Sequence, residues 1–369
     1  MVAKQKRIVL GMSGGVDSSV CAYLLKKQGY EVIGLFMQNW DQYVNNDILG
    51  HIENEDKQCN VFKDFSDVQA VAKTLGIKVY KVDFIKEYWD NVFQYLIKEY
   101  KDGRTPNPDV LCNKYIKFDA FIKYAKEQFD CDLIAMGHYA NTKVIKDTKY
   151  LTLSKDENKD QTYFLCWLNQ DQLNKTIFPL GDLTKDEVRQ IAKKQKLITH
   201  DKKESTGICF IGERKFKEFL KNYIKPKAGN VLDIVTKKNV GKHEGVMYYT
   251  IGQNKNLNLG GNKTKYYVCG KDVKKNILYV VDEVHKNKYL SSATCELEQV
   301  NWINGTQPKK NSVYLRFRHR QELVKGTFNI ENNKVTLTYK PTIGVTPGQF
   351  AVIYQSKICL GGGIVKTIK

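Results

Sequence analysis

Short apolar runs alternate with helical patterns through the first third of the chain. Strand-like apolar runs cover residues 7–12, 31–36, 77–82 and 131–136. Apolar residues at helical spacing fill the intervals, over residues 17–28, 61–75, 84–100 and 113–129. Strand and helix in this order predict a parallel α/β sheet with helices on both of its faces. The polar stretch 38–58 interrupts the pattern and predicts a mobile loop.

The pattern changes after Pro226. Two helices precede it, one opened by the capping box of Thr184 and running to Lys196, and a short one over residues 214–223. Beyond it, Gly, Asn and Pro separate short β-rich runs at 231–235, 266–268, 277–281, 313–317, 335–339 and 350–354. Such runs at close spacing predict two small β-rich modules, the last a β-barrel. We expect domains at residues 1–212, 213–285 and 286–369.

The excess of basic residues bears on which partners the chain binds. The 369 residues carry 59 Lys plus Arg against 40 Asp plus Glu, a formal charge of +19. Nucleic acid is the first candidate partner for such a surface, and an anionic membrane face is the second. A lysine-rich coding bias explains the charge equally well, because only 7 of the basic residues are Arg. No apolar run is long enough for a membrane span or a secretory signal, so we expect a cytoplasmic protein.

Cysteine usage favours reactivity over structural roles. The chain has 9 Cys, an odd number, and no Cys-x-x-Cys pair. A disulfide framework and a structural zinc site are therefore disfavoured. A thiol that matters in this chain is expected to act through its chemistry.

The sharpest motif is a glycine-rich loop between the first predicted strand and the first predicted helix. It reads Gly11-Met12-Ser13-Gly14-Gly15-Val16-Asp17-Ser18-Ser19-Val20. Glycines allow a tight turn and close approach of the backbone to a ligand, and the N–H groups at a helix start attract an anion. No Lys follows the glycines, so the loop is not of the Walker A type.

The Ser-Gly-Gly-x-Asp-Ser core of this loop resembles the signature of the PP-loop ATP pyrophosphatases. Three further segments narrow the resemblance: residues 103–113 (Gly-Arg-Thr-Pro-Asn-Pro-Asp-Val-Leu-Cys-Asn), residues 135–140 and residues 205–212 (Ser-Thr-Gly-Ile-Cys-Phe-Ile-Gly). With residues 346–349 and 359–363 near the end, the whole chain resembles the bacterial tRNA-specific 2-thiouridylases. That family replaces the C2 oxygen of the wobble uridine in tRNA with sulfur. Its first domain has the fold of the adenine nucleotide α-hydrolases.

Two cysteines lie in these segments. A persulfide on one cysteine can supply sulfur, and a second cysteine can attack it or close a disulfide afterwards. The helix expected to begin near Asn113 would place Cys112 at its N-terminus, where a thiolate is favoured. Local chemistry alone leaves open that Cys112 and Cys209 are small buried hydrophobes. The resemblance makes Cys112 the nucleophile, Cys209 the persulfide carrier and Asp109 the acid–base or positioning group.

The resemblance also implies the ligands and their contacts. It implies ATP with Mg²⁺, a cysteine desulfurase or sulfur-relay protein as donor, and the tRNAs for Lys, Glu and Gln. It implies ATP contacts at Gly11, Met12, Ser13, Gly14, Gly15, Val16, Asp17, Ser18, Met37 and Gly137. It implies tRNA contacts at Asn107, Pro108, Asp109, His138, Lys159, Asp160, Gln161, Arg316, Phe317 and Gln349.

The run 316–320 holds three of the seven Arg in five residues (Arg-Phe-Arg-His-Arg). Strand alternation would place the three Arg on one face and Phe317 with His319 on the other. Arg can pair with phosphate, and an exposed Phe317 could stack on an unpaired base. The alternative is that Phe317 belongs to the barrel core and the Arg side chains are solvated.

Two other functions fit parts of the sequence. The first is an amidotransferase-type synthetase such as GMP synthetase, which would need an ammonia source that no module ahead of the loop supplies. The second is a basic RNA-binding protein with an inherited ATP site. Release of AMP on addition of tRNA would separate an enzyme from a binder.

Overall fold

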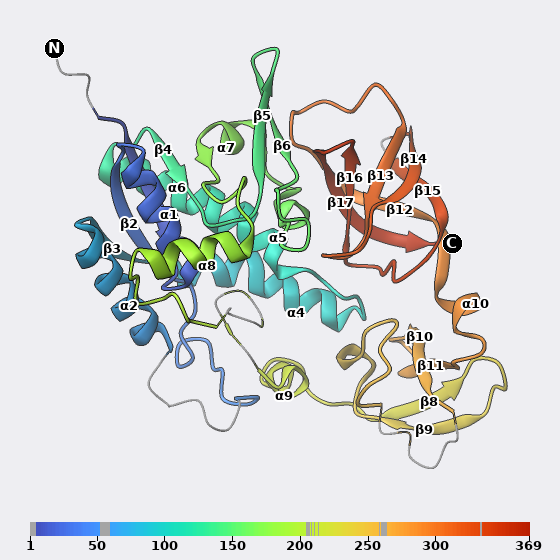
Figure 1. Cartoon of the computed structure of the whole chain (residues 1–369). Coiled ribbons are helices and arrows are strands. Elements are labelled where there is room, and N and C mark those ends of the chain that lie inside the picture. Colours follow the sequence, from blue (N-terminus) through green and yellow to red (C-terminus); the bar gives the residue numbers. More distant parts are fainter. Residues whose placement is uncertain are drawn as a thin grey trace.

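The fold begins with a five-stranded parallel sheet. The computed structural model describes residues 5–369 apart from 52–59, 204–206, 208, 210, 213, 258, 260–263 and 333. The strand order is β3-β2-β1-β4-β7, and every neighbouring pair is parallel. The strands are β1 (Arg7–Met12), β2 (Glu31–Gln38), β3 (Lys78–Asp83), β4 (Leu133–Ala135) and β7 (Thr176–Ile177). The predicted parallel α/β domain is confirmed (Figure 1).

Helices cover both faces of this sheet, because the side chains of each strand alternate between the faces. Ile8 and Leu10 of β1 pack in one apolar cluster with the first group of helices, whereas Val9 packs in another with the second group. The first group is α1 (Val16–Lys27), α2 (Asn60–Leu75) and α8 (Lys185–Lys194). The second is α3 (Ile85–Tyr88), η1 (Trp89–Phe93), α4 (Gln94–Lys101), α5 (Pro108–Cys112), η2 (Asn113–Ala120) and α6 (Phe121–Phe129).

A small β domain follows the short helix α9 (Phe216–Lys221). Its sheet has the order β10-β11-β8-β9. The sheet and the 3₁₀ turn η4 (Val246–Tyr248) contribute buried residues to the apolar cluster that also contains Val9. The strands are β8 (Gly229–Asp233), β9 (Asn239–His243), β10 (Tyr266–Asp272) and β11 (Ile277–Asp282). Helix α10 (Lys286–Leu290) leads from this domain to the next (Figure 1).

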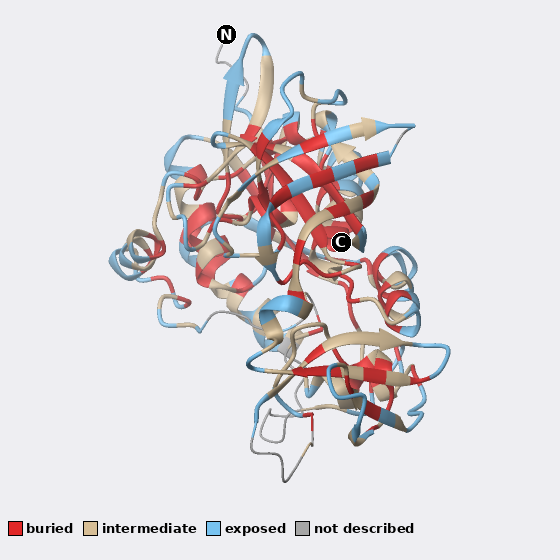
Figure 2. Ribbon diagram, turned by 90° about the vertical axis from the view of Figure 1, so that its right-hand side faces the viewer, coloured by how far each residue is buried: buried red, intermediate tan, exposed pale blue. Residues whose placement is uncertain are grey.

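The last domain is a closed six-stranded barrel, as predicted. Its order is β12-β15-β14-β13-β16-β17, and pairing of β17 with β12 closes the ring. The strands are β12 (Ser291–Trp302), β13 (Ser312–Arg316), β14 (Val324–Glu331), β15 (Lys334–Ile343), β16 (Phe350–Gln355) and β17 (Ile358–Ile368). Buried residues follow these strands and those of the other sheets (Figure 2).

One hairpin joins the first domain to the barrel. Strands β5 (Asn141–Ile145) and β6 (Thr148–Thr152) follow β4, and β6 pairs with β17 through Leu151 and Cys359. The hairpin stands between the parallel sheet and the barrel (Figure 1). The 3₁₀ turn η3 (Thr162–Leu165) and helix α7 (Gln170–Asn174) follow it. Among the described residues, no helix is both long and apolar enough to cross a membrane.

Candidate active site

The glycine-rich loop connects β1 to α1 and exposes backbone N–H groups. Gly14 has a φ of +74°, and a Cβ on it would lie 2.5 Å from the carbonyl oxygen of Asp64. Gly15 caps α1 without a side-chain hydrogen bond. The Ser18 hydroxyl accepts the N–H of Ser13 at 3.2 Å and thereby closes the turn. The loop has the backbone that an anion at a helix N-terminus requires.

Other predicted nucleotide contacts surround this loop. Gly137 follows β4, and a Cβ on it would lie 3.4 Å from the backbone nitrogen of Ser18. A Cβ on Gly11 would lie 2.6 Å from the sulfur of Met136 and 3.5 Å from the methyl carbon of Met37. The carboxyl ends of β1, β2 and β4 therefore bring the predicted ATP residues together, as expected for open α/β sheets.

The carboxylate of Asp17 is held from two sides. The ammonium group of Lys185, at the start of α8, lies 2.7 and 2.8 Å from its two oxygens. The hydroxyl of Tyr139 donates to the same carboxylate at 2.9 Å. These contacts tie the first turn of α1 to α8, and neither Lys185 nor Tyr139 was predicted.

The two predicted cysteines meet. The Sγ atoms of Cys112 and Cys209 lie 3.6 Å apart, and both cysteines are free thiols. Cys112 is fully buried, and Cys209 is partly exposed. The hydroxyl of Tyr88 donates to the carbonyl oxygen of Cys209 at 2.9 Å and fixes its backbone. Asp109 accepts a backbone hydrogen bond from Cys209. Much of the motif at 205–212 lies outside the described residues.

The predicted position of Cys112 at a helix N-terminus is wrong. Helix α5 begins at Pro108, Asn107 caps it, and Cys112 ends it where the π-helix η2 continues. The helix start therefore cannot stabilise a thiolate at Cys112. Burial raises the pKa of this thiol well above its ordinary value, and its hydrogen bond to Cys209 adds to the increase.

The charges around Cys209 act differently. A hydrogen bond from the Cys112 thiol lowers the pKa of Cys209; burial opposes this, and the ammonium group of Lys117 lowers the pKa further. Burial raises the pKa of Asp109. Sequence reasoning missed Lys117, because in an α-helix a residue five positions after Cys112 points away from it.

His138 connects the nucleotide loop with the thiol site. It follows Gly137, and its Nε2 lies 3.1 Å from Oδ1 of Asn113, the residue after Cys112. The amide of Asn113 also donates to the carbonyl oxygen of Phe164 at 3.0 Å, so that its Oδ1 faces the imidazole. Burial lowers the pKa of His138 well below its ordinary value. A neutral imidazole with Nε2–H then leaves Nδ1 as an acceptor, and Nδ1 has no partner among the described residues.

Two predicted tRNA-binding segments contact each other. Arg316 lies at the end of β13, and its Nη1 is 3.0 Å from Oδ1 of Asp160 in a buried ion pair. Burial raises the pKa of Asp160, and hydrogen bonds from Thr162 and Ser154 oppose the increase. Gln161 accepts the backbone N–H of Tyr139 at 2.9 Å. Asp160 is thus held against the end of β13, and Gln161 against the segment that follows β4.

The alternation predicted for residues 316–320 is wrong, because β13 ends at Arg316. Arg318 donates instead to the carbonyl oxygen of Gly344 at 2.9 Å, and Arg320 has a φ of +64° in the loop. The ring of Phe317 is 1% exposed inside the barrel, which is the core alternative that the sequence left open. Stacking of this ring on a base would need the barrel to open.

Gln349 links the barrel to the segment that enters α5. Its amide donates to the carbonyl oxygens of Thr105 at 2.8 Å and Pro106 at 3.1 Å. The side chain of Asn107 reaches Gln349 at 3.4 Å, and Pro347 accepts the N–H of Thr105 at 3.1 Å. The predicted tRNA residues 107–109 and 349 therefore lie together.

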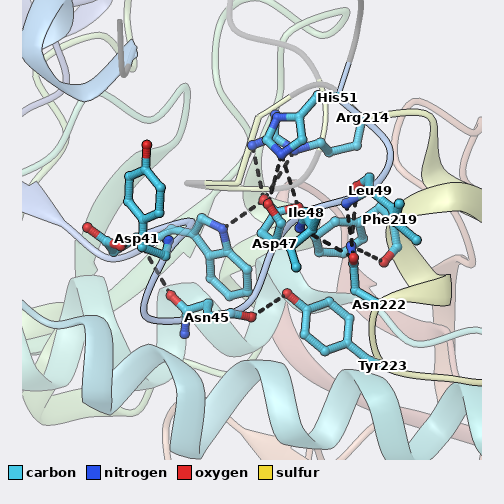
Figure 3. Close-up of polar contacts among 12 residues, drawn as sticks. Asp41, Asn45, Asp47, Ile48, Leu49, His51, Arg214, Phe219, Asn222 and Tyr223 are labelled. Carbon is cyan, nitrogen blue, oxygen red and sulfur yellow. Dashed lines mark hydrogen bonds and ion pairs between the residues drawn. The ribbon is translucent and has the colours of Figure 1, made fainter. Parts of the chain in front are cut away.

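The mobile loop predicted over 38–58 is wrong for the part before residue 52, which has fixed contacts (Figure 3). Residues 52–58 lie outside the described part of the chain. The fully buried carboxylate of Asp47 accepts from the indole of Trp40 at 3.1 Å and from Nη2 of Arg214 at 3.1 Å. A charged pair at this depth needs such partners.

Residues 45–49 of this loop hydrogen-bond the two residues that follow α9, Asn222 and Tyr223 (Figure 3). Oδ1 of Asn222 accepts the backbone N–H groups of Ile48 at 3.3 Å and Leu49 at 3.0 Å. The hydroxyl of Tyr223 donates to the carbonyl oxygen of Asn45 at 2.8 Å. The loop thus anchors the segment that follows the second cysteine.

Comparisons with known proteins cover the whole chain. Residues 6–213 match the model of a tRNA methyl transferase HUP domain, residues 217–282 a tRNA methyl transferase PRC-barrel domain, and residues 292–365 an aminomethyltransferase beta-barrel domain. The tRNA-specific 2-thiouridylase MnmA of Ureaplasma parvum serovar 3 is 52% identical over 99% of this chain and 95% of its own length. That of Mycoplasma capricolum subsp. capricolum is 54% identical over 99% of this chain and its full length. The chain therefore belongs to the tRNA-specific 2-thiouridylase family.

Proposed function

We propose that this chain 2-thiolates a uridine of tRNA by activating the C2 oxygen with ATP and delivering sulfur through two cysteines. The relatives to which it is similar are named tRNA-specific 2-thiouridylases, which supports the 2-thiolation of uridine but not the individual steps. One observation carries the proposed mechanism. Cys112 and Cys209 are 97 residues apart in sequence, and their sulfurs approach to 3.6 Å beside Asp109. Two thiols at this distance can pass a sulfur atom and close a disulfide.

The nucleotide step is proposed to occur at the loop Gly11–Ser18. Gly14 admits the backbone approach, and the start of α1 has no side-chain cap that would compete with phosphate. Met37 and Gly137 are proposed to contact the nucleotide. ATP, with its Mg²⁺, supplies the adenylyl group. The uracil O2 attacks the α-phosphorus, pyrophosphate leaves, and the N3 proton is lost.

Asp109 is proposed to handle that proton. Burial raises the pKa of its carboxyl group, which brings proton exchange closer to neutral pH. The carboxyl group lies on the first turn of α5, one turn before Cys112. It therefore faces the site at which the sulfur must arrive.

The sulfur step is proposed to start from a persulfide on Cys209. Its terminal sulfur attacks C2, the C2–O bond breaks, and AMP leaves with the former O2. The thiolate of Cys112 then attacks the Cys209 sulfur, which releases 2-thiouridine and leaves a Cys112–Cys209 disulfide. A dithiol reductant restores both thiols, and a cysteine desulfurase or relay protein reloads Cys209. Alternatively, Cys112 attacks the persulfide first and hydrogen sulfide attacks C2, with the same products.

Substrate access requires an opening. Cys112 is fully buried, so the groups that cover it must move before a uridine can lie beside it. The tRNA is proposed to contact residues 107–109, His138, residues 159–161, Arg316 and Gln349. The proposed substrates are the tRNAs for Lys, Glu and Gln.

The test is reconstitution of the reaction with tRNA transcript, Mg-ATP and a persulfide donor. The product is 2-thiouridine, detected by retardation in a mercury-containing gel, with AMP measured in parallel. Cys209→Ser and Cys112→Ser are expected to abolish thiolation. Cys131→Ser is the matched control, because Cys131 is also partly exposed. Full activity of Cys209→Ser would refute the mechanism.

A further inference from the structure

A lysine without an assigned role lies at the thiol site. Lys117 belongs to η2, where the backbone follows the π pattern and the N–H of Phe121 donates to the carbonyl of Ile116, five residues earlier. In an α-helix, a residue five positions after Cys112 would point about 140° away from it. In the π pattern, residues five apart lie one turn apart. The π segment therefore places the side chain of Lys117 on the same side of the helix as Cys112.

Three groups that can carry negative charge surround this ammonium group. Lys117 hydrogen-bonds the sulfur of Cys209 and interacts electrostatically with the other two groups, which belong to Cys112 and Asp109. Burial lowers the pKa of Lys117, but the surrounding groups outweigh burial, and its pKa is raised overall. The lysine therefore keeps its charge inside the site. A buried charge is stable only when such partners compensate it.

The two sulfurs are not equivalent around this charge. Burial dominates at Cys112 and raises its pKa well above the ordinary value. At Cys209 the hydrogen bond from Cys112 acts first and Lys117 reinforces it, so its pKa is lowered. Asp109 opposes ionisation of both sulfurs, and the buried hydroxyl of Tyr88 is occupied by the Cys209 carbonyl. Lys117 is the cation among the groups with the largest effects on the pKa of Cys209.

We propose that Lys117 is the positioning residue that selects Cys209 over Cys112 as the anionic sulfur. It holds the Cys209 thiolate that takes a sulfane sulfur from the donor persulfide while the donor departs as a thiolate. It then holds the terminal sulfur of the Cys209 persulfide as an anion until C2 is activated. This inference rests on the proposed persulfide mechanism and adds the group that assigns the two thiols their roles.

Lys117→Met tests this directly, because Met keeps most of the side-chain volume and removes the charge. The readout is the rate of alkylation of Cys209 by iodoacetamide against pH, measured peptide by peptide with mass spectrometry. The midpoint for Cys209 is expected to rise by about one pH unit, which is about a tenfold loss of thiolate below the midpoint. Lys117→Arg is expected to restore the wild-type midpoint. Lys114→Met is the matched control, because Lys114 lies on the same π-helix and packs over the ring of Trp167.

A second readout separates the sulfur step from the nucleotide step. Lys117→Met is expected to form pyrophosphate from ATP and tRNA at the wild-type rate in a single turnover, and to form 2-thiouridine at least about tenfold more slowly. If Lys117→Met does not fold, the Cys209 midpoint is measured instead by ultraviolet thiolate absorbance against pH. The absorbance of wild type minus that of Cys209→Ser gives the Cys209 midpoint, and the same difference in the Lys117→Arg background gives the midpoint with arginine in place of lysine. An unchanged Cys209 midpoint in folded Lys117→Met, or a wild-type thiolate signal that survives Cys209→Ser, would overturn the inference. The proposed function would survive that result, since it falls only if Cys209→Ser still thiolates tRNA.

Discussion

The buried ion pair between Asp47 and Arg214 should control how firmly the Cys209 segment is held. The perturbation is Arg214→Met, which removes the cation and leaves the carboxylate of Asp47 buried. At the observed 3.1 Å, an effective dielectric constant of 20 gives an attraction of about 5 kcal/mol. The indole N–H of Trp40 still donates to the carboxylate after the change. We therefore expect a loss of about 3 kcal/mol, at the lower end of the range for breaking a buried pair.

Hydrogen exchange is the appropriate assay, because a chain of three domains has no single free energy of unfolding. A loss of about 3 kcal/mol corresponds to exchange about 100-fold faster for the amides of α9 and the residues that follow it. Lys217→Met on α9 is the matched control. Its pair with Glu244 has 27% and 46% of the two side chains exposed, so we expect a change below about 1 kcal/mol.

The double variant decides whether the pair itself is responsible. Asp47→Asn removes the charge that Arg214→Met leaves unpaired, so the two changes together should cost less than Arg214→Met alone. Thiolation should follow the same order, since Arg214 lies five residues after Cys209. An unchanged hydrogen-exchange rate of α9 in Arg214→Met would refute the reasoning. So would a double variant in which the losses of stability of the two single variants simply add.

Three further predictions concern the other parts of the site. Gly14→Ala should abolish measurable ATP binding in equilibrium dialysis, because its φ is +74° and its Cβ would meet the backbone of Asp64 at 2.5 Å; unchanged binding would contradict the assigned loop. Arg316→Met leaves the charge of Asp160 unpaired in the interior and should speed hydrogen exchange in β13, and Asp160→Asn should partly restore the wild-type rate; an unchanged exchange rate would contradict the buried pair. Asp109→Asn should abolish thiolation and raise the stability of the domain that contains α5 at neutral pH. The sign follows from the pKa, which burial raises in the folded state, so that stability is lost as pH rises through it; denaturation at pH 4 should therefore show a smaller difference than at pH 8, and an equal difference would be inconsistent with this.

The sequence predicted the elements whose signals are local. Strands β1 and β2 are buried apolar runs, and the capping box of Thr184 is present as expected, with Glu187 as its partner. The two-residue strand β7 was not predicted. The start of α5 also carried a local signal. Asn107 is an N-cap and Pro108 stands at the first helical position, a pattern typical of helix starts. Greater weight on that pattern would have placed Cys112 at the end of a helix and not at its beginning.

Other features depend on partners far away in the chain. Strands β5 and β6 have largely exposed or half-exposed side chains, and β6 completes its pairing with β17, about 200 residues later. No periodicity in a single segment encodes such a pairing. The ion pair of Asp47 with Arg214 spans 167 residues, and the π pattern of η2 changes which residues share a face. The candidate cysteines were predictable from their motifs, but the charge that distinguishes them was not.

The position of the barrel has a consequence for the thiol site. In the segment before β16, the side chain of Gln349 donates to the carbonyl oxygens of Thr105 and Pro106. The carbonyl oxygen of Pro347 accepts the N–H of Thr105. Arg104, just before Thr105, pairs with Glu298 of β12. A displacement of the barrel must therefore either break these hydrogen bonds or carry the start of α5 with it. Because α5 bears Asp109 and Cys112, the position of the barrel and the alignment of the thiol site are mechanically linked.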